Sequence, residues 1–218
     1  MKLVWCPETA ARAYIDAVKA LAEQEVGETE VAEMVSAMAG GWKAQLIVDA
    51  GTCGDCAATS VGLQAAARYT GGRHICVVPE GQSLMEYREV MRRAGLESAV
   101  AATPVMAGEA EEVMRELEGV DFVVVDWRRR DAAKVLRAAR AGPGGMVVVC
   151  RSAGRWRGSA AAVVKGAGMR VVRSALLPIE WGVEVLYVGV GKGPSLDGSR
   201  SRWIRHVDQD GEEHLFRR

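Results

Sequence analysis

Residues 121–150, DFVVVDWRRRDAAKVLRAARAGPGGMVVVC, hold one complete repeat of an alternating pattern. Two short runs of mostly β-branched residues, at 121–126 and 146–150, flank a stretch at 131–141 whose apolar residues recur every three or four positions. Neither run alternates apolar with polar residues, which is typical of strands buried on both faces of a parallel sheet. Glycine and proline at 142–145 favour a tight turn after the helix. The stretch therefore predicts a strand–helix–strand unit.

The same alternation extends along the chain in both directions. Further strands are expected at 45–50, 74–78, 99–103, 169–174 and 183–190, and further helices at 57–69, 84–94 and 109–117. Strands joined in this way by helices predict an α/β, Rossmann-like, doubly wound sheet, here of seven strands and mostly parallel. Only residues 175–182 separate the last two strands, which is too short for a helical crossover, so we expect an antiparallel last strand.

Two helices, at 8–24 and 28–39, are expected before the sheet, and a C-terminal β-hairpin after it. The hairpin is expected because Asp210-Gly211, a favoured tight turn, lies between strand-like segments at 203–207 and 212–216. We interpret residues 1–218 as a single domain of ordinary size. Within it, 1–43 would form the N-terminal helices, 44–191 the Rossmann-like core, and 192–218 a loop and the hairpin.

Composition excludes several classes of protein. The chain is 49% hydrophobic and 26% charged, as ordinary globular proteins are, so global disorder is excluded. No apolar run approaches the roughly 18 residues of a membrane span, and the N-terminal residues lack a secretory signal pattern. The five cysteines are an odd number, which favours free thiols in a reducing compartment. We therefore expect a cytoplasmic or nuclear protein.

The formal net charge is zero, from 28 basic and 28 acidic residues, which argues against general nucleic-acid binding. The two halves of the chain differ, however. Residues 1–126 carry 10 basic and 20 acidic residues, whereas residues 127–218 carry 18 basic and 8 acidic residues. The basic half begins directly after the fourth expected strand, which is compatible with a local anion site. These patterns leave a homodimer open.

The loops after the strands hold the candidate site, because ligands of open α/β sheets bind at the carboxyl ends of the strands. Acidic residues, glycines and other small residues follow four of the expected strands: Asp49, Gly51, Cys53 and Gly54; Glu80; Glu109 and Ala110; and Asp126 with Trp127. Glycines let a backbone approach a ligand closely, and carboxylates accept hydrogen bonds from hydroxyl and amino groups. The set favours a nucleotide-like small-molecule ligand. The alternatives are an ordinary tight strand–helix turn after the first strand and a solvated Glu80 at the start of a helix.

In this order and spacing, the loops resemble those of class I S-adenosylmethionine-dependent methyltransferases. The nearest characterised branch looks like the small catechol and caffeoyl-CoA O-methyltransferases, through residues 108–117, 121–126 and 144–149. This resemblance covers roughly residues 45–190. The chain as a whole looks even closer to a plant family of unknown function with this fold, through residues 2–10, 39–42, 206–208 and 211–214.

The methyltransferase resemblance implies S-adenosylmethionine as the cofactor and a role for each loop. Its methionine part would lie along Asp49, Gly51, Cys53 and Gly54, its ribose at Glu80, its adenine at Glu109 and Ala110, and its methyl group near Asp126 and Trp127. The metal-dependent enzymes carry Asp-Asn after the fifth strand, where this chain has Arg151-Ser152. One carboxylate cannot build an octahedral magnesium site, so we expect no metal there.

Methyl transfer to oxygen or nitrogen needs a deprotonated acceptor and therefore a nearby base. Asp126 is the best candidate. Of the three histidines, His74 begins the second strand, at the opposite end of the sheet, and is expected to be structural. His206 and His214 lie on the expected hairpin. One of them would reach the pocket only if that hairpin folds over the strand ends; a solvated surface role is the alternative.

Basic and aromatic residues follow the fourth and fifth strands, on the acceptor side: Arg128, Arg151, Arg155, Trp156 and Arg157. Guanidinium groups bind carboxylates and phosphates, and Trp stacks on planar groups. Solvated loops or a partner surface are the alternatives. The first hypothesis is therefore a metal-independent methyltransferase for a small anionic or planar acceptor. The second is a catalytically inactive, methyltransferase-like binding or regulatory protein, and the third is dithiol redox chemistry through Cys53 and Cys56.

Overall fold

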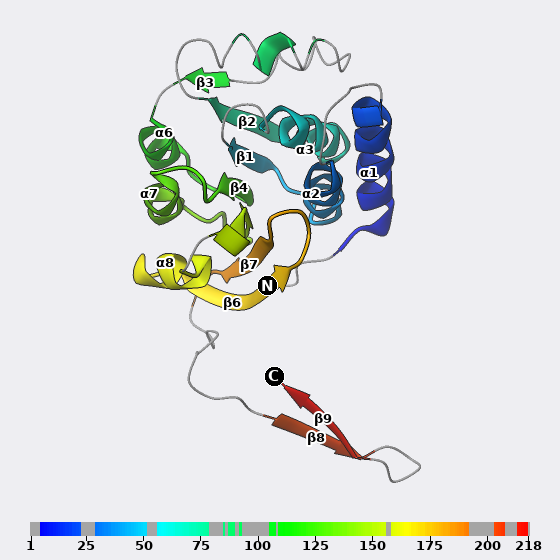
Figure 1. Ribbon diagram of the computed structural model, residues 1–218, viewed down its shortest axis with the longest axis vertical. Coiled ribbons are helices and arrows are strands. Elements are labelled where there is room, and N and C mark those ends of the chain that lie inside the picture. Colours follow the sequence, from blue (N-terminus) through cyan, green and yellow to red (C-terminus); the bar gives the residue numbers. More distant parts are fainter. Residues whose placement is uncertain are drawn as a thin grey trace.

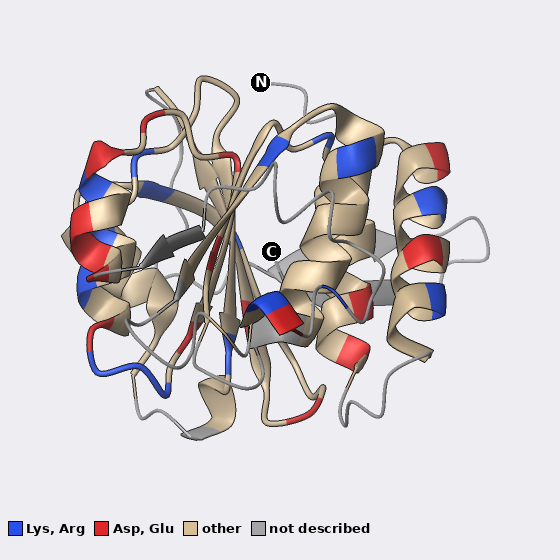
Figure 2. Ribbon diagram, turned by 90° about the horizontal axis from the view of Figure 1, so that it is seen from above, with Lys and Arg blue, Asp and Glu red and all other residues tan. Residues whose placement is uncertain are grey.

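The computed structural model describes residues 5–22, 29–51, 56–78, 85, 87–89, 92, 105–107, 109–155, 158–191, 203–207 and 213–217. A central sheet lies between two layers of helices in this part of the chain (Figure 1). Seen from above, the helical layers flank the sheet on both faces, and many of the charged residues lie on the helices and loops (Figure 2). The molecule is thus a three-layer α/β structure.

The central sheet has the strand order β3-β2-β1-β4-β5-β7-β6. Its strands are β1 (Leu46–Ala50), β2 (Arg73–Val78), β3 (Val105–Ala107), β4 (Phe122–Asp126), β5 (Met146–Arg151), β6 (Arg170–Leu177) and β7 (Val183–Gly189). The pairs among β1 to β5 are parallel, and β7 is antiparallel to both of its neighbours. The predicted Rossmann-like α/β fold, a mixed sheet that is mostly parallel, is confirmed.

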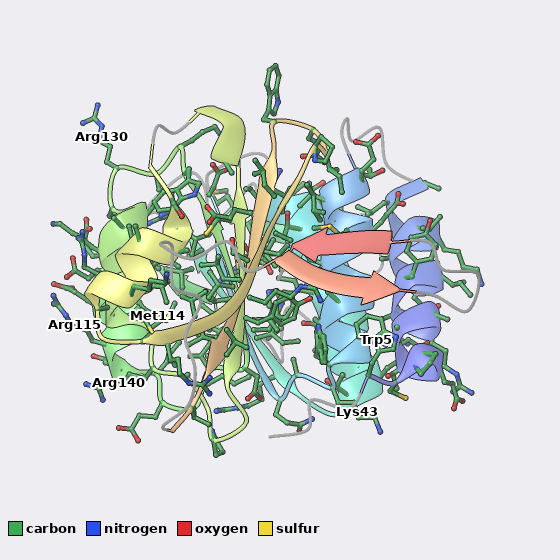
Figure 3. The ribbon with its side chains drawn as sticks, turned by 90° about the horizontal axis from the view of Figure 1, so that it is seen from below. Trp5, Lys43, Met114, Arg115, Arg130 and Arg140 are labelled. Atoms are coloured by element: carbon green, nitrogen blue, oxygen red, sulfur yellow. The ribbon has the colours of Figure 1, made fainter. Side chains whose placement is uncertain are left out.

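Helices of the described residues lie on both sides of the sheet. On one side lie α1 (Pro7–Ala22), α2 (Glu30–Gly41) and α3 (Cys56–Thr70), and on the other α6 (Ala110–Glu116), α7 (Ala132–Ala138) and α8 (Ala160–Gly166), with a 3-10 turn, η1, at Ala153–Arg155. Helix α1 packs on the outer side of α2 and α3. Helices α1 and α6 are amphipathic, with buried residues at helical spacing, whereas residues 58–67 of α3 are buried all round. In α6, Met114 lies inward while its neighbour Arg115 projects outward, as does Arg140 after α7 (Figure 3).

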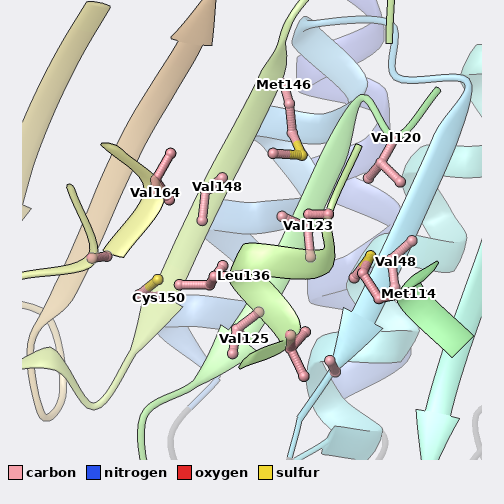
Figure 4. Packing of buried hydrophobic residues seen from close by; sticks show 14 of the residues in the cluster. Val48, Met114, Val120, Val123, Val125, Leu136, Met146, Val148, Cys150 and Val164 are labelled. Atoms are coloured by element: carbon pink, nitrogen blue, oxygen red, sulfur yellow. The ribbon is translucent and has the colours of Figure 1, made fainter. Parts of the chain in front are cut away.

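The apolar strands fill a core on each face of the sheet. Successive strand residues face opposite sides, so Phe122 and Val124 pack in one cluster while Val123 and Val125 pack in the other. Figure 4 shows the second cluster, where Val123 and Val125 lie near Leu136 of α7. β1, β4 and β5 are buried along their whole length. This double burial explains why their sequences carry no polar alternation.

Several details differ from the sequence predictions. The third strand is Val105–Ala107 and not 99–103, which lies outside the described residues together with most of the expected helix at 84–94. Helix α8 was not predicted, because its run of Ala and Val lacks a clear amphipathic period. The structure shows why it forms: Ser159 caps it through a hydrogen bond from Ala161 N–H, and Val164 is buried against the sheet.

The predicted C-terminal hairpin is present. β8 (Trp203–Val207) and β9 (Glu213–Arg217) form an antiparallel two-stranded sheet. Figure 1 draws this hairpin apart from the larger sheet. Among the described residues, the helices are too short or too polar to span a bilayer.

Candidate functional site

The candidate site lies where the sheet changes winding direction. β2 and β3 lie beyond β1, and β5, β7 and β6 lie beyond β4, so β1 and β4 are the adjacent strands at the switch point. Their register places Asp49 beside Val124 and Ala50 beside Val125. Ligands of open α/β sheets bind at the carboxyl ends of the strands at such a point. The loops after β1 and β4 therefore border the expected crevice.

Buried charge is concentrated at this edge of the sheet. Among the described residues, the buried Asp, Glu, Arg and Lys residues are Asp49, Asp126, Arg151 and Glu184. The first three stand at or near the ends of β1, β4 and β5, and Glu184 is the second residue of the antiparallel β7, beside Cys150. Burying charge is costly unless it is paired, so each group needs a partner. The partners of these four groups define the chemistry of the edge.

Asp49 joins β1 to α3. Its carboxylate Oδ2 accepts a hydrogen bond of 2.7 Å from the Ser60 hydroxyl, and that hydroxyl also lies 3.4 Å from Cys76 Sγ of β2. The contact holds α3 against the carboxyl end of β1. Of the other residues predicted here, Gly51 is described and buried, whereas Cys53 and Gly54 lie outside the described residues.

Arg129 ties the loop after β4 to the loop after β1. Its Nη1 donates a 2.8 Å hydrogen bond to the Gly51 carbonyl, and Nε and Nη2 donate to the two carboxylate oxygens of Asp131 at 2.9 and 2.8 Å. Burial raises the pKa of Asp131, but the hydrogen bonds and charge of Arg129 outweigh it and hold the pKa below its usual value. Arg129 is the middle residue of the arginine run after the fourth strand, which the sequence placed on the acceptor side; the structure shows it holding two loops together.

Asp126, at the end of β4, is fully buried and is held by Arg128. Arg128 Nε donates to both carboxylate oxygens at 3.1 and 3.0 Å, Nη2 donates to Oδ2 at 2.5 Å, and the Arg128 backbone N–H donates to Oδ1 at 2.8 Å. Burial raises the pKa of Asp126. The hydrogen bonds from Arg128 and the charges of Arg128 and Arg151 have the larger, opposite effect and hold the pKa below its usual value. Such a carboxylate is a weak proton acceptor, which disfavours the predicted role of Asp126 as a base.

Arg151 stands beside Asp126 in the sheet register and joins three elements. Its side chain is 8% exposed; Nη1 donates to Thr59 Oγ1 of α3 at 3.0 Å, and Nη2 lies 3.7 Å from Glu180 Oε2 in the β6–β7 turn. Glu180 has a left-handed backbone (φ 48°), and its Oε1 accepts a 3.1 Å hydrogen bond from Val31 N–H in the first turn of α2. The buried guanidinium is therefore linked through Glu180 to an N-terminal helix.

Glu184 caps helix α8 beside this network. Its carboxylate accepts hydrogen bonds from Ala160 N–H at 2.9 Å and from the Ser159 hydroxyl at 3.1 Å. A carboxylate at a helix N-terminus satisfies free N–H groups and is favoured by the helix dipole. Burial and the nearby charges of Glu184 and Asp126 raise the pKa of the Cys150 thiol, which keeps it protonated. Glu184 is therefore a structural cap that sequence analysis did not anticipate.

Only some of the other predicted site residues lie in the part of the chain that the structure describes. Glu109 is exposed just before α6, Ala110 is buried, and Trp127 is partly buried against the core, with its backbone N–H donating to the Arg151 carbonyl at 3.1 Å. Arg130 projects from the surface (Figure 3). Glu80 lies outside the described residues. The structure therefore brings Asp49, Gly51, Asp126, Arg128 and Arg151 to one edge, whereas Trp156, Arg157 and the side chain of Arg155 lie outside the described residues.

His74 is a core residue of β2. Its Nδ1 lies 3.2 Å from Gln64 Oε1, and burial lowers its pKa to about 3. It pairs in register with Ile47, near the amino end of β1. The structural role predicted for it fits this position.

Solved structures of methyltransferases share this fold. A methyltransferase from Geobacter sulfurreducens matches with a TM-score of 0.61 at 15% identity, over 82% of this chain and 88% of that one. The SAH-bound methyltransferase PaMTH1 from Podospora anserina matches with a TM-score of 0.55 at 13% identity, over 85% and 90%. A candidate caffeoyl-CoA O-methyltransferase from Staphylococcus aureus matches with a TM-score of 0.52 at 11% identity, over 73% and 83%.

At such identities the similarity defines the fold, and the protein has the α/β Rossmann-like fold of methyltransferases. None of the curated proteins compared with the chain matches it. The model of one family, DUF1442, described as a protein of unknown function, matches residues 1–218. The chain belongs to the DUF1442 family.

Proposed function

We propose that the protein binds S-adenosylmethionine at the carboxyl ends of β1 and β4. The observation that carries the proposal is the set of paired, buried charges at the switch point of a fold that methyltransferases share. A protein with this fold is described as SAH-bound, that is, bound to the demethylated cofactor. Binding at this edge also agrees with the general position of ligand sites in open α/β sheets.

The residues at the edge fit the groups of the cofactor. The buried carboxylate of Asp49 would supply negative potential near a site for the positively charged sulfonium, and Gly51 allows close backbone approach. The exposed Glu109, beside Ala110, would accept a hydrogen bond from the adenine amino group. Glu80 would accept hydrogen bonds from the ribose hydroxyls. Cys53, Gly54 and Trp127 would complete the lining. When bound, the cofactor supplies an electrophilic methyl group.

For the reaction, we propose two candidates that differ in catalysis. One is metal-independent methyl transfer to a small anionic or planar acceptor, with Arg155, Trp156 and Arg157 on the acceptor side. The other is a catalytically inactive binding or regulatory protein. The second is favoured by the contacts of Asp126, since Arg128 engages both oxygens of the carboxylate that would otherwise take up a proton. An acceptor that arrives already deprotonated would reconcile the first candidate with this geometry.

Several narrower expectations stay predictions. They are a plant source, a cytoplasmic or nuclear location, a single domain, a homodimer and the dithiol chemistry of Cys53 and Cys56.

Calorimetric titration with S-adenosylmethionine and its demethylated product tests the proposal. Glu109 precedes α6 without a side-chain capping bond, so Glu109→Ala should leave the fold intact while weakening binding about tenfold through one lost charge-assisted hydrogen bond. Glu116→Ala, at the other end of α6, is the matched control and should bind like the wild type. Absence of binding to both ligands at millimolar concentration would overturn the proposal. Binding without turnover across a panel of acceptors would select the inactive candidate.

A further inference from the structure

Three consecutive arginines follow β4, and each of them has a different environment. Arg128 holds a buried carboxylate, and Arg130 projects from the surface (Figure 3). The side chain of Arg129 is only 9% exposed, and all three nitrogens of its guanidinium donate hydrogen bonds. One acceptor is Gly51, directly after β1, and the other is Asp131, shortly after β4. Arg129 therefore joins the ends of the two strands that meet at the switch point.

Asp131 occupies the N-cap position of α7 without capping this helix. An aspartate at an N-cap usually accepts a hydrogen bond from a backbone N–H of the first turn. Here the side chain makes no capping bond, and its two oxygens accept from Arg129 at 2.9 and 2.8 Å. Such a bidentate pair holds the guanidinium in one orientation and balances its charge. The carboxylate of Asp131 therefore supports Arg129 and not the helix.

Gly51 is the residue whose backbone this pair fixes. Glycine has no side chain to restrict its backbone, so a fixed conformation needs contacts from elsewhere in the chain. Arg129 supplies one, a 2.8 Å hydrogen bond to the Gly51 carbonyl. The proposed cofactor site places Gly51 beside the methionine part of S-adenosylmethionine, which carries the positively charged sulfonium. A guanidinium near this position would repel the sulfonium unless a carboxylate balanced its charge.

We propose that Arg129 and Asp131 are a positioning pair for the cofactor. Arg129 fixes Gly51, and Asp131 keeps the pair neutral, so that it does not repel the sulfonium. This inference rests on the proposed function, since it requires the cofactor to bind beside Gly51. A pair with only a structural role would affect both forms of the cofactor equally. A charge-balanced pair would distinguish them, because S-adenosylmethionine carries a sulfonium and its demethylated product a neutral thioether.

Calorimetric titration of the full chain with both forms of the cofactor tests this role. Asp131→Asn leaves the charge of Arg129 unbalanced, so the affinity for S-adenosylmethionine should fall about fivefold more than the affinity for the product. Arg129→Met releases the Gly51 carbonyl and leaves the carboxylate unbalanced. The affinity for the product should therefore fall about tenfold, and the affinity for S-adenosylmethionine should fall less. Arg130→Gln, at the exposed neighbour, is the matched control and should bind both forms like the wild type.

Hydrogen exchange without ligand gives a second measurement that does not depend on cofactor binding. Arg129→Met should speed exchange in a peptide that contains Gly51 and leave residues 146–151 of β5 unchanged. Unchanged exchange around Gly51 would overturn the positioning role. A wild type that binds neither form would overturn the proposed function together with this inference. Wild-type binding with the same ratio of the two affinities in Asp131→Asn, Arg129→Met and the control would overturn this inference alone.

Discussion

The contact between Arg151 and Glu180 should couple the carboxyl end of β5 to helix α2. Glu180→Gln keeps the shape of the side chain and an acceptor for Val31 N–H, but it removes the charge that faces the guanidinium. Arg151→Met removes the guanidinium and keeps most of the length of the side chain. Comparing both single variants with the double variant isolates the interaction between the two groups.

The burial of the pair sets the expected magnitude. Its side chains are 8% and 4% exposed, so removing one partner leaves the other charge buried with less compensation, which costs at most about 3–5 kcal/mol. Because Arg151 keeps its hydrogen bond to Thr59, we expect about 3 kcal/mol for Glu180→Gln. The double variant should be less destabilised than the sum of the two singles, with a coupling energy of about 1–3 kcal/mol.

Urea unfolding followed by circular dichroism measures these free energies. The exposed pair of Glu8 and Arg12 is the control, since its nitrogen–oxygen distance is shorter, at 2.7 Å, yet its side chains are 71% and 58% exposed. The corresponding cycle there should give about 0.5 kcal/mol or less. Additive effects of Arg151→Met and Glu180→Gln, within about 0.5 kcal/mol, would refute the reasoning that burial makes this pair strong.

Three further predictions concern packing and pH. Gly62→Ala should lower the free energy of unfolding by about 1–3 kcal/mol, because the new Cβ would stand 2.3 Å from the Ala32 carbonyl oxygen. Gly166→Ala should raise the free energy of unfolding by about 0.4–1 kcal/mol, because its Cβ would meet open space. Equal effects in urea unfolding would contradict the close contact between α2 and α3. Since the pKa of His74 is lowered to about 3, wild-type stability should be complete above about pH 6.5 and fall, relative to His74→Gln, by about 1.4 kcal/mol per pH unit towards pH 3. A difference between these two proteins that stays constant from pH 7 to 5 would count against a buried neutral imidazole. Since the pKa of Asp126 is lowered, its pair with Arg128 stabilises the fold above about pH 4, and this stabilisation is lost as the pH falls below that value. The difference in unfolding free energy between the wild type and Asp126→Asn should therefore become smaller in acid. A difference that does not depend on pH would contradict this.

Local patterns were sufficient to predict every strand of the sheet except β3, which lies at Val105–Ala107 and not at 99–103. Residues 122–125 and 146–150 are apolar without alternation, and only strands buried on both faces need such a composition. The short connection at 175–182 was sufficient for the antiparallel β7, since no helical crossover fits there. The sequence was also sufficient to predict that Asp49 and Asp126 lie at the same edge of the sheet, because the carboxyl ends of parallel strands meet at one edge. Helix α8 was missed because its periodicity is weak and its cap comes partly from Glu184, 24 residues beyond Ala160.

The partners of the buried charges depended on the tertiary structure. Arg129 reaches the Gly51 carbonyl across 78 residues of sequence, and Arg151 reaches Thr59 across 92. An arginine after a strand can equally bind a ligand, face solvent or pair internally, and its local sequence is the same in each case. Arg128 pairs with Asp126, two residues before it, whereas only the packing of the β6–β7 turn gave Arg151 the carboxylate of Glu180, because a buried charge is stable only beside a compensating one. The amino-acid pattern was therefore enough for the fold and the edge of the sheet that holds the site, whereas the charge state and pairing of that edge follow from contacts between distant segments.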